Sequence, residues 1–306
     1  YAVLFPGQGS QSVGMCPDAR GAYPDLCGVP ANNVLGWDLE SLVRDGPEEL
    51  LTETQHAQPA LYAVSYALWS EFTSHTTRPP AASCGHSLGE YTALAASGAL
   101  EYLDGLRLVA KRGEAMAAAA ELEPSGMAAL LGADVALAES VVTRRADEGG
   151  RLSIANINAP GQVVLAGGHD DLEWLVANAR ELGVRRAIRL KVAGAFHSPY
   201  MASAAEQLTG ALESVSFSEQ AFDVYANATA RPTTDPRATL IQQLTAPVRF
   251  AESLGQIAGH GVETFVHIGP GDVTAGLAKR TVKGSNVKVV SSLEEARTVA
   301  AEVSVQ

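Results

Sequence analysis

The segment Gly85-His86-Ser87-Leu88-Gly89 constrains the fold of this chain more than any other. A short apolar run (81–84) precedes it, and a helical stretch of small residues (88–96) follows it. This is the setting of a nucleophile elbow, a turn so tight that only glycine fits two positions before and after the serine. Such a turn would hold the Ser87 hydroxyl near the positive end of a helix, where backbone N–H groups can stabilise an oxyanion. Because Gly-x-Ser-x-Gly also occurs by chance in many proteins, the rest of the sequence has to decide.

Composition excludes several classes of protein. The 306 residues are 46% hydrophobic, enough for a sizeable core, and no run of apolar residues is long enough to span a membrane. The formal charge of −12 argues against nucleic acid and anionic membranes as partners. Residues 1–5 are expected to form a buried strand and not a signal peptide, and the three cysteines suit neither a disulfide framework nor a zinc site. We therefore expect a cytoplasmic protein without a bound metal.

Short buried strands alternate with helices over most of the chain, which predicts an α/β fold with a parallel sheet. Helices are expected over 48–72, 103–120 and 201–212, and strands over 3–5, 223–226 and 262–268. Four turns follow predicted strands, and sites in parallel sheets lie at the carboxyl ends of strands. We therefore expect up to four turns to converge on one crevice: Gly7-Gln8-Gly9, the turn at Ser87, the turn at His197 and Gly269-Pro270-Gly271.

A middle segment has its own pattern. Strands are expected over 127–132, 152–156, 162–166 and 187–192, with helices over 135–148 and 172–182. The order β-α-β-β-α-β is that of a ferredoxin-like unit. The sequence thus predicts a large α/β domain formed by residues 1–124 and 194–306, interrupted by a ferredoxin-like subdomain over residues 125–193.

A serine nucleophile needs a base within hydrogen-bond reach, and the chain has seven histidines. His197 is the best candidate, because it lies in a loop bounded by glycine and proline after a predicted strand. His86 is expected to support the turn, and His267 lies inside an apolar strand, where a core histidine with satisfied hydrogen bonds is the simpler interpretation. His75 and His169 are expected in polar loops.

Several motifs occur together and in order along the chain, and with the elbow they span nearly all of it: Phe5-Pro6-Gly7-Gln8-Gly9-Ser10-Gln11, Lys111-Arg112-Gly113, Asn156-Ile157-Asn158-Ala159-Pro160, Gly194-Ala195-Phe196-His197-Ser198-Pro199 and Gly269-Pro270-Gly271. In this combination the chain closely resembles the malonyl-CoA:acyl carrier protein transacylases and the acyltransferase domains of polyketide synthases. The resemblance implies an α/β-hydrolase-like body with a ferredoxin-like insertion, in agreement with the organisation above.

The resemblance also implies roles for individual residues. Ser87 would attack the thioester of malonyl-CoA, with His197 as general base and then general acid. The backbone carbonyl of Gln243 would orient His197, so the pair would be a dyad and not a triad. Backbone N–H groups of Gln8 and Leu88 would form the oxyanion hole. Arg112 would hold the free carboxylate of the malonyl group, although without the resemblance it could equally be a surface arginine like Arg107.

The resemblance also implies a substrate preference. Leu88 and the Ala195-Phe196-His197-Ser198 segment resemble the malonyl-selective pattern, in which Phe196 fills the space that a methylmalonyl group needs; Asn158 is a further substrate-binding position. A methyl group is worth only about 1–3 kcal/mol, so other acyl groups stay possible substrates. Ala195 replaces the histidine of many polyketide synthase domains, and Tyr200 replaces a frequent leucine.

The implied partner is an acyl carrier protein, whose phosphopantetheine thiol would take the acyl group without any bound cofactor. Carrier proteins are acidic, as this chain is, so docking needs a local basic patch. The candidates are two clusters, each of which could simply be a solvated face: Arg185, Arg186, Arg189 and Lys191 in the small subdomain, and Lys279, Arg280 and Lys283 near the last glycine turn.

Two other functions are compatible with this sequence. An esterase or an editing acyl hydrolase would also need Ser87 and His197, although Arg112 argues against a general esterase. A carrier-protein-binding module with a vestigial site is the non-enzymatic alternative. The sequence does not distinguish fatty acid from polyketide synthesis.

Overall fold

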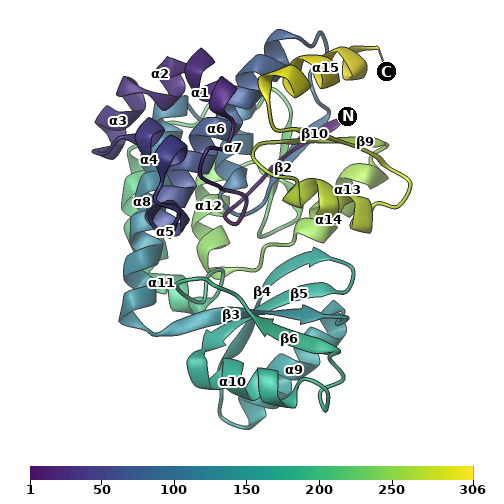
Figure 1. Ribbon diagram of the computed structural model, residues 1–306. Helices are drawn as coiled ribbons and strands as arrows, with labels where there is room; N and C mark the ends of the chain where they lie inside the picture. The colour runs from purple at the N-terminus through teal and green to yellow at the C-terminus, as the bar shows by residue number, and fades with distance from the viewer. Residues whose placement is uncertain (306) are drawn as a thin grey trace.

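The computed structural model describes residues 1–305 and contains two separate β-sheets (Figure 1). The larger sheet has the strand order β10-β9-β1-β2-β7-β8, and all neighbouring strands are parallel except the short last pair. Its strands in chain order are β1 (Ala2–Phe5), β2 (Ala82–Gly85), β7 (Asp223–Ala226), β8 (Arg231–Pro232), β9 (Thr264–Ile268) and β10 (Asn286–Val290). The predicted parallel sheet is therefore present.

Helices from the N-terminal and the C-terminal parts of the chain pack on this sheet. The longest are α6 (Thr54–Ser74) and α8 (Tyr102–Leu122), which flank the short buried helix α7 (Gly89–Ala96). The others are α1 (Pro17–Ala22), α2 (Pro24–Cys27), α3 (Val29–Leu35), α4 (Leu39–Asp45), α5 (Glu48–Thr52), the 3₁₀ turn η1 (Pro199–Met201), α11 (Ala202–Glu213), α12 (Pro236–Thr245), α13 (Phe250–Gly259), α14 (Val273–Thr281) and α15 (Leu293–Ser304). No helix among residues 1–305 is long and apolar enough to cross a membrane.

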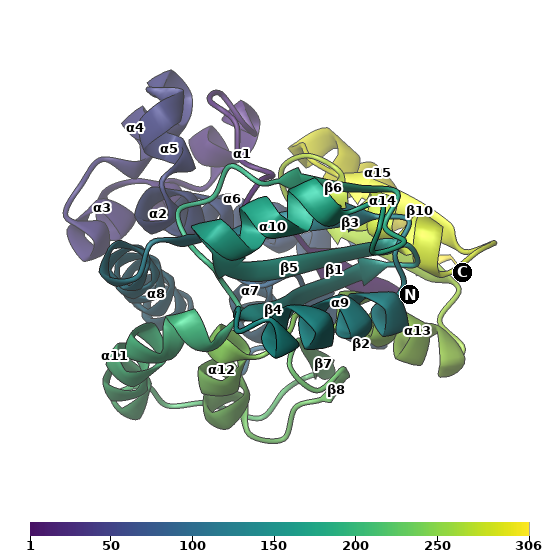
Figure 2. The same ribbon diagram turned by 90° about the horizontal axis from the view of Figure 1, so that it is seen from below.

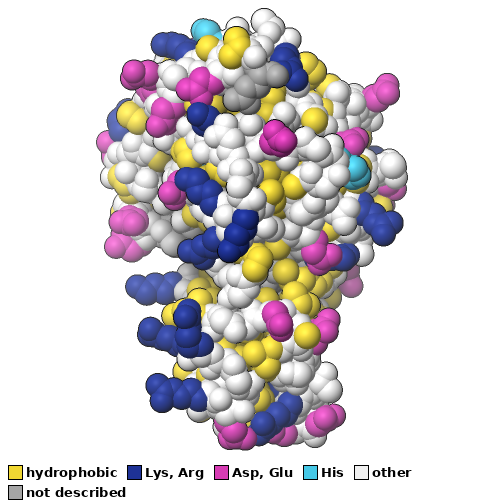
Figure 3. Space-filling model, turned by 90° about the vertical axis from the view of Figure 1, so that its right-hand side faces the viewer, with side chains coloured by type: hydrophobic (Ala, Val, Ile, Leu, Met, Phe, Trp, Pro, Cys, Tyr) yellow, Lys and Arg dark blue, Asp and Glu magenta, His cyan; other side chains and the backbone are white. Residues whose placement is uncertain are grey.

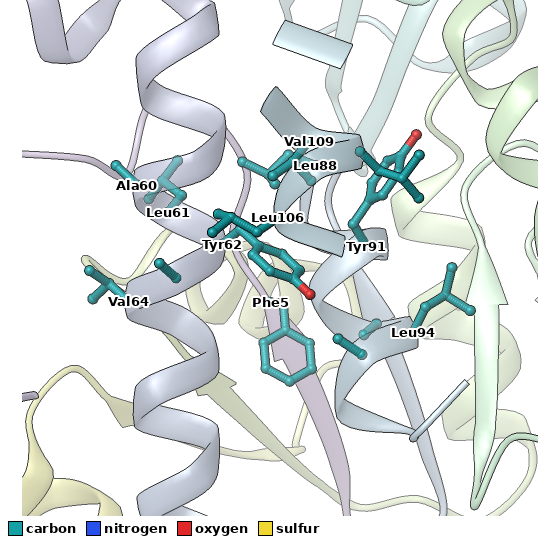
Figure 4. Packing of buried hydrophobic residues seen from close by; sticks show 14 of the residues in the cluster. Phe5, Ala60, Leu61, Tyr62, Val64, Leu88, Tyr91, Leu94, Leu106 and Val109 are labelled. Atoms are coloured by element: carbon teal, nitrogen blue, oxygen red, sulfur yellow. The ribbon is translucent and has the colours of Figure 1, made fainter. Parts of the chain in front are cut away.

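The core beside the elbow is formed by the three helices α6, α7 and α8 together with β1 (Figure 4). This core contains Phe5 from β1, Tyr91 and Leu94 from α7, and Leu106 from α8. None of these four side chains is exposed. Burying a large apolar side chain stabilises a fold by roughly 1.5–3 kcal/mol, so this packing fixes the start of α7 firmly. The elbow is thus built on a rigid support.

The smaller sheet is antiparallel and has the order β4-β5-β3-β6. Figure 2 shows its two helices on the outer face, so the other face is turned toward the large body. In chain order the elements are β3 (Ser125–Leu131), α9 (Val135–Asp147), β4 (Leu152–Ala159), β5 (Gln162–Gly168), α10 (His169–Asn178) and β6 (Arg186–Arg189). This is the predicted succession of strands and helices. A backbone bridge from Ile157 N–H to Val248 O, 2.8 Å, ties this sheet to the large body.

Two predicted elements differ from the structure. The helix expected over 48–72 is two helices, since Glu53 adopts an extended backbone between α5 and α6. The helix expected over 172–182 begins earlier, at His169, and ends at Asn178. Its first turn carries Asp170 and Asp171, which favour a helix N-terminus by their charge. The placement of His169 in a polar loop is therefore wrong.

Candidate active site

Ser87 lies on the expected sharp turn between β2 and α7, in a left-handed backbone conformation (φ 52°) that non-glycine residues rarely adopt. A Cβ atom at Gly85 would collide with the backbone of Gly89, and one at Gly89 would collide with the carbonyl of Phe5. Both glycines are therefore required by close backbone approach. The strain at Ser87 persists because the surrounding packing fixes the turn, as is common at functional sites.

His197 lies beside Ser87, although 110 residues separate the two along the chain. The Ser87 Oγ–His197 Nε2 distance is 2.7 Å, and His197 Nδ1 lies 2.8 Å from the backbone carbonyl of Gln243 in α12. Since a carbonyl only accepts, Nδ1 carries the proton and Nε2 is free to accept one from the serine hydroxyl. The geometry is that of a Ser–His dyad oriented by a backbone carbonyl.

The electrostatics keep this histidine neutral. Burial and, to a smaller extent, the nearby positive charge of Arg112 together lower the pKa of His197 to about 3, although the hydrogen bond to Gln243 acts in the opposite direction. A neutral imidazole is the form that can accept a proton from a serine hydroxyl. His197 is thus in its basic form over the physiological pH range.

Arg112 is a buried residue of the site and not a surface arginine. It is 1% exposed, and its Nη2 atom lies 3.0 Å from Ser87 Oγ and 2.8 Å from Gln243 Oε1. Its Nη1 atom donates to Gln58 Oε1 at 2.7 Å. By contrast, Arg107 is exposed and pairs with Asp104. The structure therefore separates the two arginines that sequence reasoning alone left equivalent.

The cleft above Ser87 has a volume of about 280 Å³ and lies between the two sheets. The other predicted site residues line it: Gln8, Leu88, Phe196 and Asn158. Leu88 also packs into the core, where it is 1% exposed, and Figure 4 shows it against Val109. Asn158 Oδ1 lies 2.7 Å from His86 Nε2, so His86 supports the turn as expected.

One of the four expected turns does not contribute to the cleft. The Gly7-Gln8-Gly9 turn, Ser87 and His197 line it, but Gly269-Pro270-Gly271 does not. Gly269 instead packs against Pro6, next to the Gly7-Gln8-Gly9 turn. The helix that follows, α14, lines the cleft with Val273 and Leu277. His267 is completely buried within β9, as expected of a core histidine. Tyr200 is not among the lining residues and stacks under Arg151.

Sequence reasoning missed three polar residues that hold this site together. Asn227, just after β7, accepts the Ser87 N–H through Oδ1 at 2.7 Å and donates through Nδ2 to Gly85 O at 2.7 Å. Glu90 accepts from the Asn227 N–H and from Gln243 Nε2. Gln58 binds Arg112, as described above. Of these three residues, only Glu90 could have been noticed in the sequence, because it directly follows the elbow. A carboxylate buried at that position needs polar partners.

The first basic cluster reaches the cleft, and the second lies at the end of α14, a helix that lines the cleft through Val273 and Leu277. Their seven side chains are exposed, and Lys191 lines the cleft. Arg280 of α14 donates to Gln162 Oε1 at 2.9 Å, which joins the second cluster to the small sheet. Figure 3 shows Lys and Arg side chains gathered along one edge of this face, from the large body down onto the small sheet. Within residues 1–305, no three His, Cys, Asp or Glu side chains are grouped as a metal site.

Known proteins are similar to this chain in both sequence and fold. The model of the acyl transferase domain family matches residues 3–301. The malonyl CoA-acyl carrier protein transacylase of Bacillus subtilis is 40% identical over 96% of this chain and 94% of its own length. The polyketide biosynthesis protein ThaF of Burkholderia thailandensis is 38% identical over 92% of this chain, which is 24% of ThaF.

Solved structures agree with these matches. The acyl-carrier-protein S-malonyltransferase of Bartonella henselae superposes with a TM-score of 0.93 at 35% identity, covering 100% of this chain and 99% of the other. A malonyl-transacylase bound to a type II polyketide synthase acyl carrier protein superposes with a TM-score of 0.92 at 35% identity and covers 99% of each chain.

Proposed function

This chain belongs to the acyl transferase domain family, and from that premise we propose that it transfers a malonyl group from malonyl-CoA to the phosphopantetheine thiol of an acyl carrier protein. The observation that carries the proposal is the position of Ser87 Oγ. It lies 2.7 Å from the base that can activate it and 3.0 Å from a buried guanidinium that can bind an acidic acyl group. The product would supply extender units for fatty acid or polyketide synthesis.

In the first half of the reaction, His197 Nε2 takes the proton of Ser87 as the hydroxyl oxygen attacks the thioester carbonyl. The resulting oxyanion would be bound by the N–H groups of Leu88 and Gln8, the first of which follows from the elbow geometry. Collapse of the intermediate expels the CoA thiolate, to which His197 returns the proton. A malonyl ester of Ser87 and free CoA remain.

In the second half, the carrier protein's thiol replaces CoA and the same steps run in reverse. His197 takes the proton of the thiol, the sulfur attacks the ester, and Ser87 leaves with the proton from His197. This is a ping-pong cycle, and it needs no bound metal or cofactor. Asn227 and Gln243 hold the backbone of Ser87 from both sides, so the nucleophile stays in place through both halves.

Arg112 selects the acyl group. A guanidinium can bind a carboxylate through two parallel N–H bonds, and its burial makes an acyl group without a carboxylate a poor replacement. Phe196 and Leu88 line the same cleft, and we assign to them the preference for malonyl over methylmalonyl. Asn158 would contact the substrate from β4.

We also propose a more specific fold class for each part of the chain. We class the large body as α/β-hydrolase-like and residues 125–193 as ferredoxin-like, supported by the elbow at the end of β2 and by the order β4-β5-β3-β6 of the small sheet. The carrier protein would dock on one or the other of the two basic clusters. We place the enzyme in the cytoplasm, supported by three buried cysteines that are all free thiols.

Intact-mass spectrometry tests the function. The protein is mixed in turn with malonyl-, acetyl- and methylmalonyl-CoA, and a carrier protein bearing phosphopantetheine is then added. We expect a malonyl adduct that moves to the carrier protein, and weaker adducts from the other two thioesters. Release of free malonate without transfer would instead identify an acyl hydrolase, and the absence of any adduct would identify a binding module.

A further inference from the structure

Among residues 1–305, no carboxylate lies in hydrogen-bond contact with the buried cation Arg112. Its three acceptors are Gln58 Oε1, Gln243 Oε1 and Ser87 Oγ, all of them neutral. A fully buried charge without a counter-charge is costly, because the protein interior solvates it much less well than water does. The balancing negative charge must therefore lie one step further away.

Glu90 is in that position. It is completely buried, and its Oε2 atom accepts from Gln243 Nε2 at 2.7 Å and from the Asn227 N–H at 2.9 Å. The amide of Gln243 thus joins the two charges, since its oxygen accepts from Arg112 and its nitrogen donates to Glu90. The other carboxylate oxygen of Glu90, Oε1, has no hydrogen-bond partner among the described residues. Glu90 is therefore a buried carboxylate held by neutral donors alone.

We propose that Glu90 is the counter-charge of Arg112 in the free enzyme, and that it takes up a proton when the carboxylate of the acyl group binds Arg112. The inference rests on the proposed function. Two carboxylates would then share one buried guanidinium, and in a buried site like charges of this kind are relieved by protonation of one of them. The substrate carboxylate contacts the cation directly, so Glu90 is the one that becomes neutral.

The other titratable groups around Glu90 cannot take its place. On its own helix, burial raises the pKa of the Tyr91 phenol well above its ordinary value, and in β2 burial raises that of the Cys84 thiol. Burial lowers the pKa of both His197 and His86, so both stay neutral. Burial raises the pKa of Glu90 itself to about 7, against the opposing effects of its two hydrogen bonds and of Arg112. Proton uptake is thus expected above about pH 7, where free Glu90 is charged.

The chain offers a matched substitution. In Glu90→Gln, the side-chain oxygen can still accept from Asn227 and Gln243, while the new NH₂ group occupies the position of Oε1, which has no partner to lose. The variant therefore removes the charge and keeps both hydrogen bonds. Glu114→Gln serves as the control, because Glu114 is an exposed acid on α8, the helix of Arg112.

The experiment measures the dissociation constant of malonyl-CoA between pH 7 and 9 in Ser87→Ala protein, which cannot be acylated. With Glu90 present, the constant should rise with pH, approaching tenfold per unit for one proton. In the double variant Ser87→Ala/Glu90→Gln it should be flat, and Glu114→Gln should behave like Ser87→Ala alone. Calorimetry in buffers of different protonation enthalpy should count up to one proton taken up, and none in the Glu90→Gln protein.

Acetyl-CoA provides an arm that leaves Glu90 unchanged and so does not depend on the folding of a variant. It has the same CoA phosphates but no acyl carboxylate, so its dissociation constant should not show the added pH dependence. Equal pH dependence for malonyl- and acetyl-CoA, or the same uptake with and without Glu90, would overturn the inference. If wild-type protein forms no malonyl adduct, the proposed function itself fails; if the adduct forms without proton uptake on binding, only the role of Glu90 fails.

Discussion

Replacing Arg112 with alanine should remove the preference for an acidic acyl group. Its guanidinium is 1% exposed and 3.0 Å from the Ser87 oxygen, so a bound malonyl carboxylate would form a desolvated, charge-assisted pair with it. Removing one partner of such a pair costs about 2–5 kcal/mol. This corresponds to a roughly 30- to 5,000-fold lower kcat/KM for malonyl-CoA.

Acetyl-CoA distinguishes this effect from damage to the dyad. Arg112 also contacts Ser87 and Gln243, so its loss can slow acylation by any thioester. Damage to the dyad should lower the rate of acylation equally with both substrates. Loss of carboxylate binding should lower that rate only with malonyl-CoA. The assay is the rate of acyl-enzyme formation from each thioester, followed by intact mass in rapid-quench samples.

Two further variants complete the comparison. Arg112→Lys keeps the charge but has no planar fork, so it should recover only part of the malonyl preference. Arg107→Ala, one turn earlier on α8 and exposed, should behave like wild type. An Arg112→Ala protein that loses the same factor with malonyl- and acetyl-CoA would refute the assignment of Arg112 to the acyl carboxylate.

Three other predictions follow from the same geometry. In Gly89→Ala the new methyl group would collide with the backbone of Phe5, so the variant should lose about 1–3 kcal/mol of unfolding free energy in denaturant titrations, while Gly276→Ala, in open space on α14, should lose none. Because burial lowers the pKa of His197 to about 3, kcat/KM for malonyl-CoA should show no acid limb between pH 5.5 and 7.5; a limb near the ordinary histidine value would contradict the neutral base. Charge reversal at Lys279 and Arg280, or at Arg185 and Arg186, should raise the KM for carrier protein but not for malonyl-CoA, and equal changes in both constants would rule out docking there.

The sequence predicted those parts of the fold and site that depend on local pattern. The elbow could be read from Gly85 and Gly89 because their close approach leaves room for no side chain. The four strands and two helices of the segment 125–193 were predicted from the pattern of the sequence, and the strand over 223–226 matches β7. His197 could be singled out from its loop between glycine and proline, whereas Arg112 and Gln243 were reached only through motif resemblance, because nothing local distinguishes Arg112 from Arg107. The structure brings these residues together, and their catalytic roles are still predictions.

The remaining features depend on contacts between distant segments. Asn227 clamps Ser87 across 140 residues, and Gln58 meets Arg112 across 54, so no spacing along the chain signals either. The break at Glu53 and the early start of α10 depend on helix ends, where apolar periodicity says little. The helices between Pro17 and Asp45 are only four to seven residues long, and neither they nor α12 to α15 were predicted.

In the proposed reaction, Ser87 carries the malonyl group from the thiol of CoA to the thiol of the carrier protein. The most direct test isolates the protein after reaction with malonyl-CoA, maps the adduct by peptide mass spectrometry, and chases it with a phosphopantetheine-bearing carrier protein. We predict that the malonyl group is found on the peptide containing Ser87, is absent in Ser87→Ala, and moves to the carrier thiol faster than it is released to water. An adduct on another residue, or loss to water at the same rate with and without carrier protein, would contradict the claim.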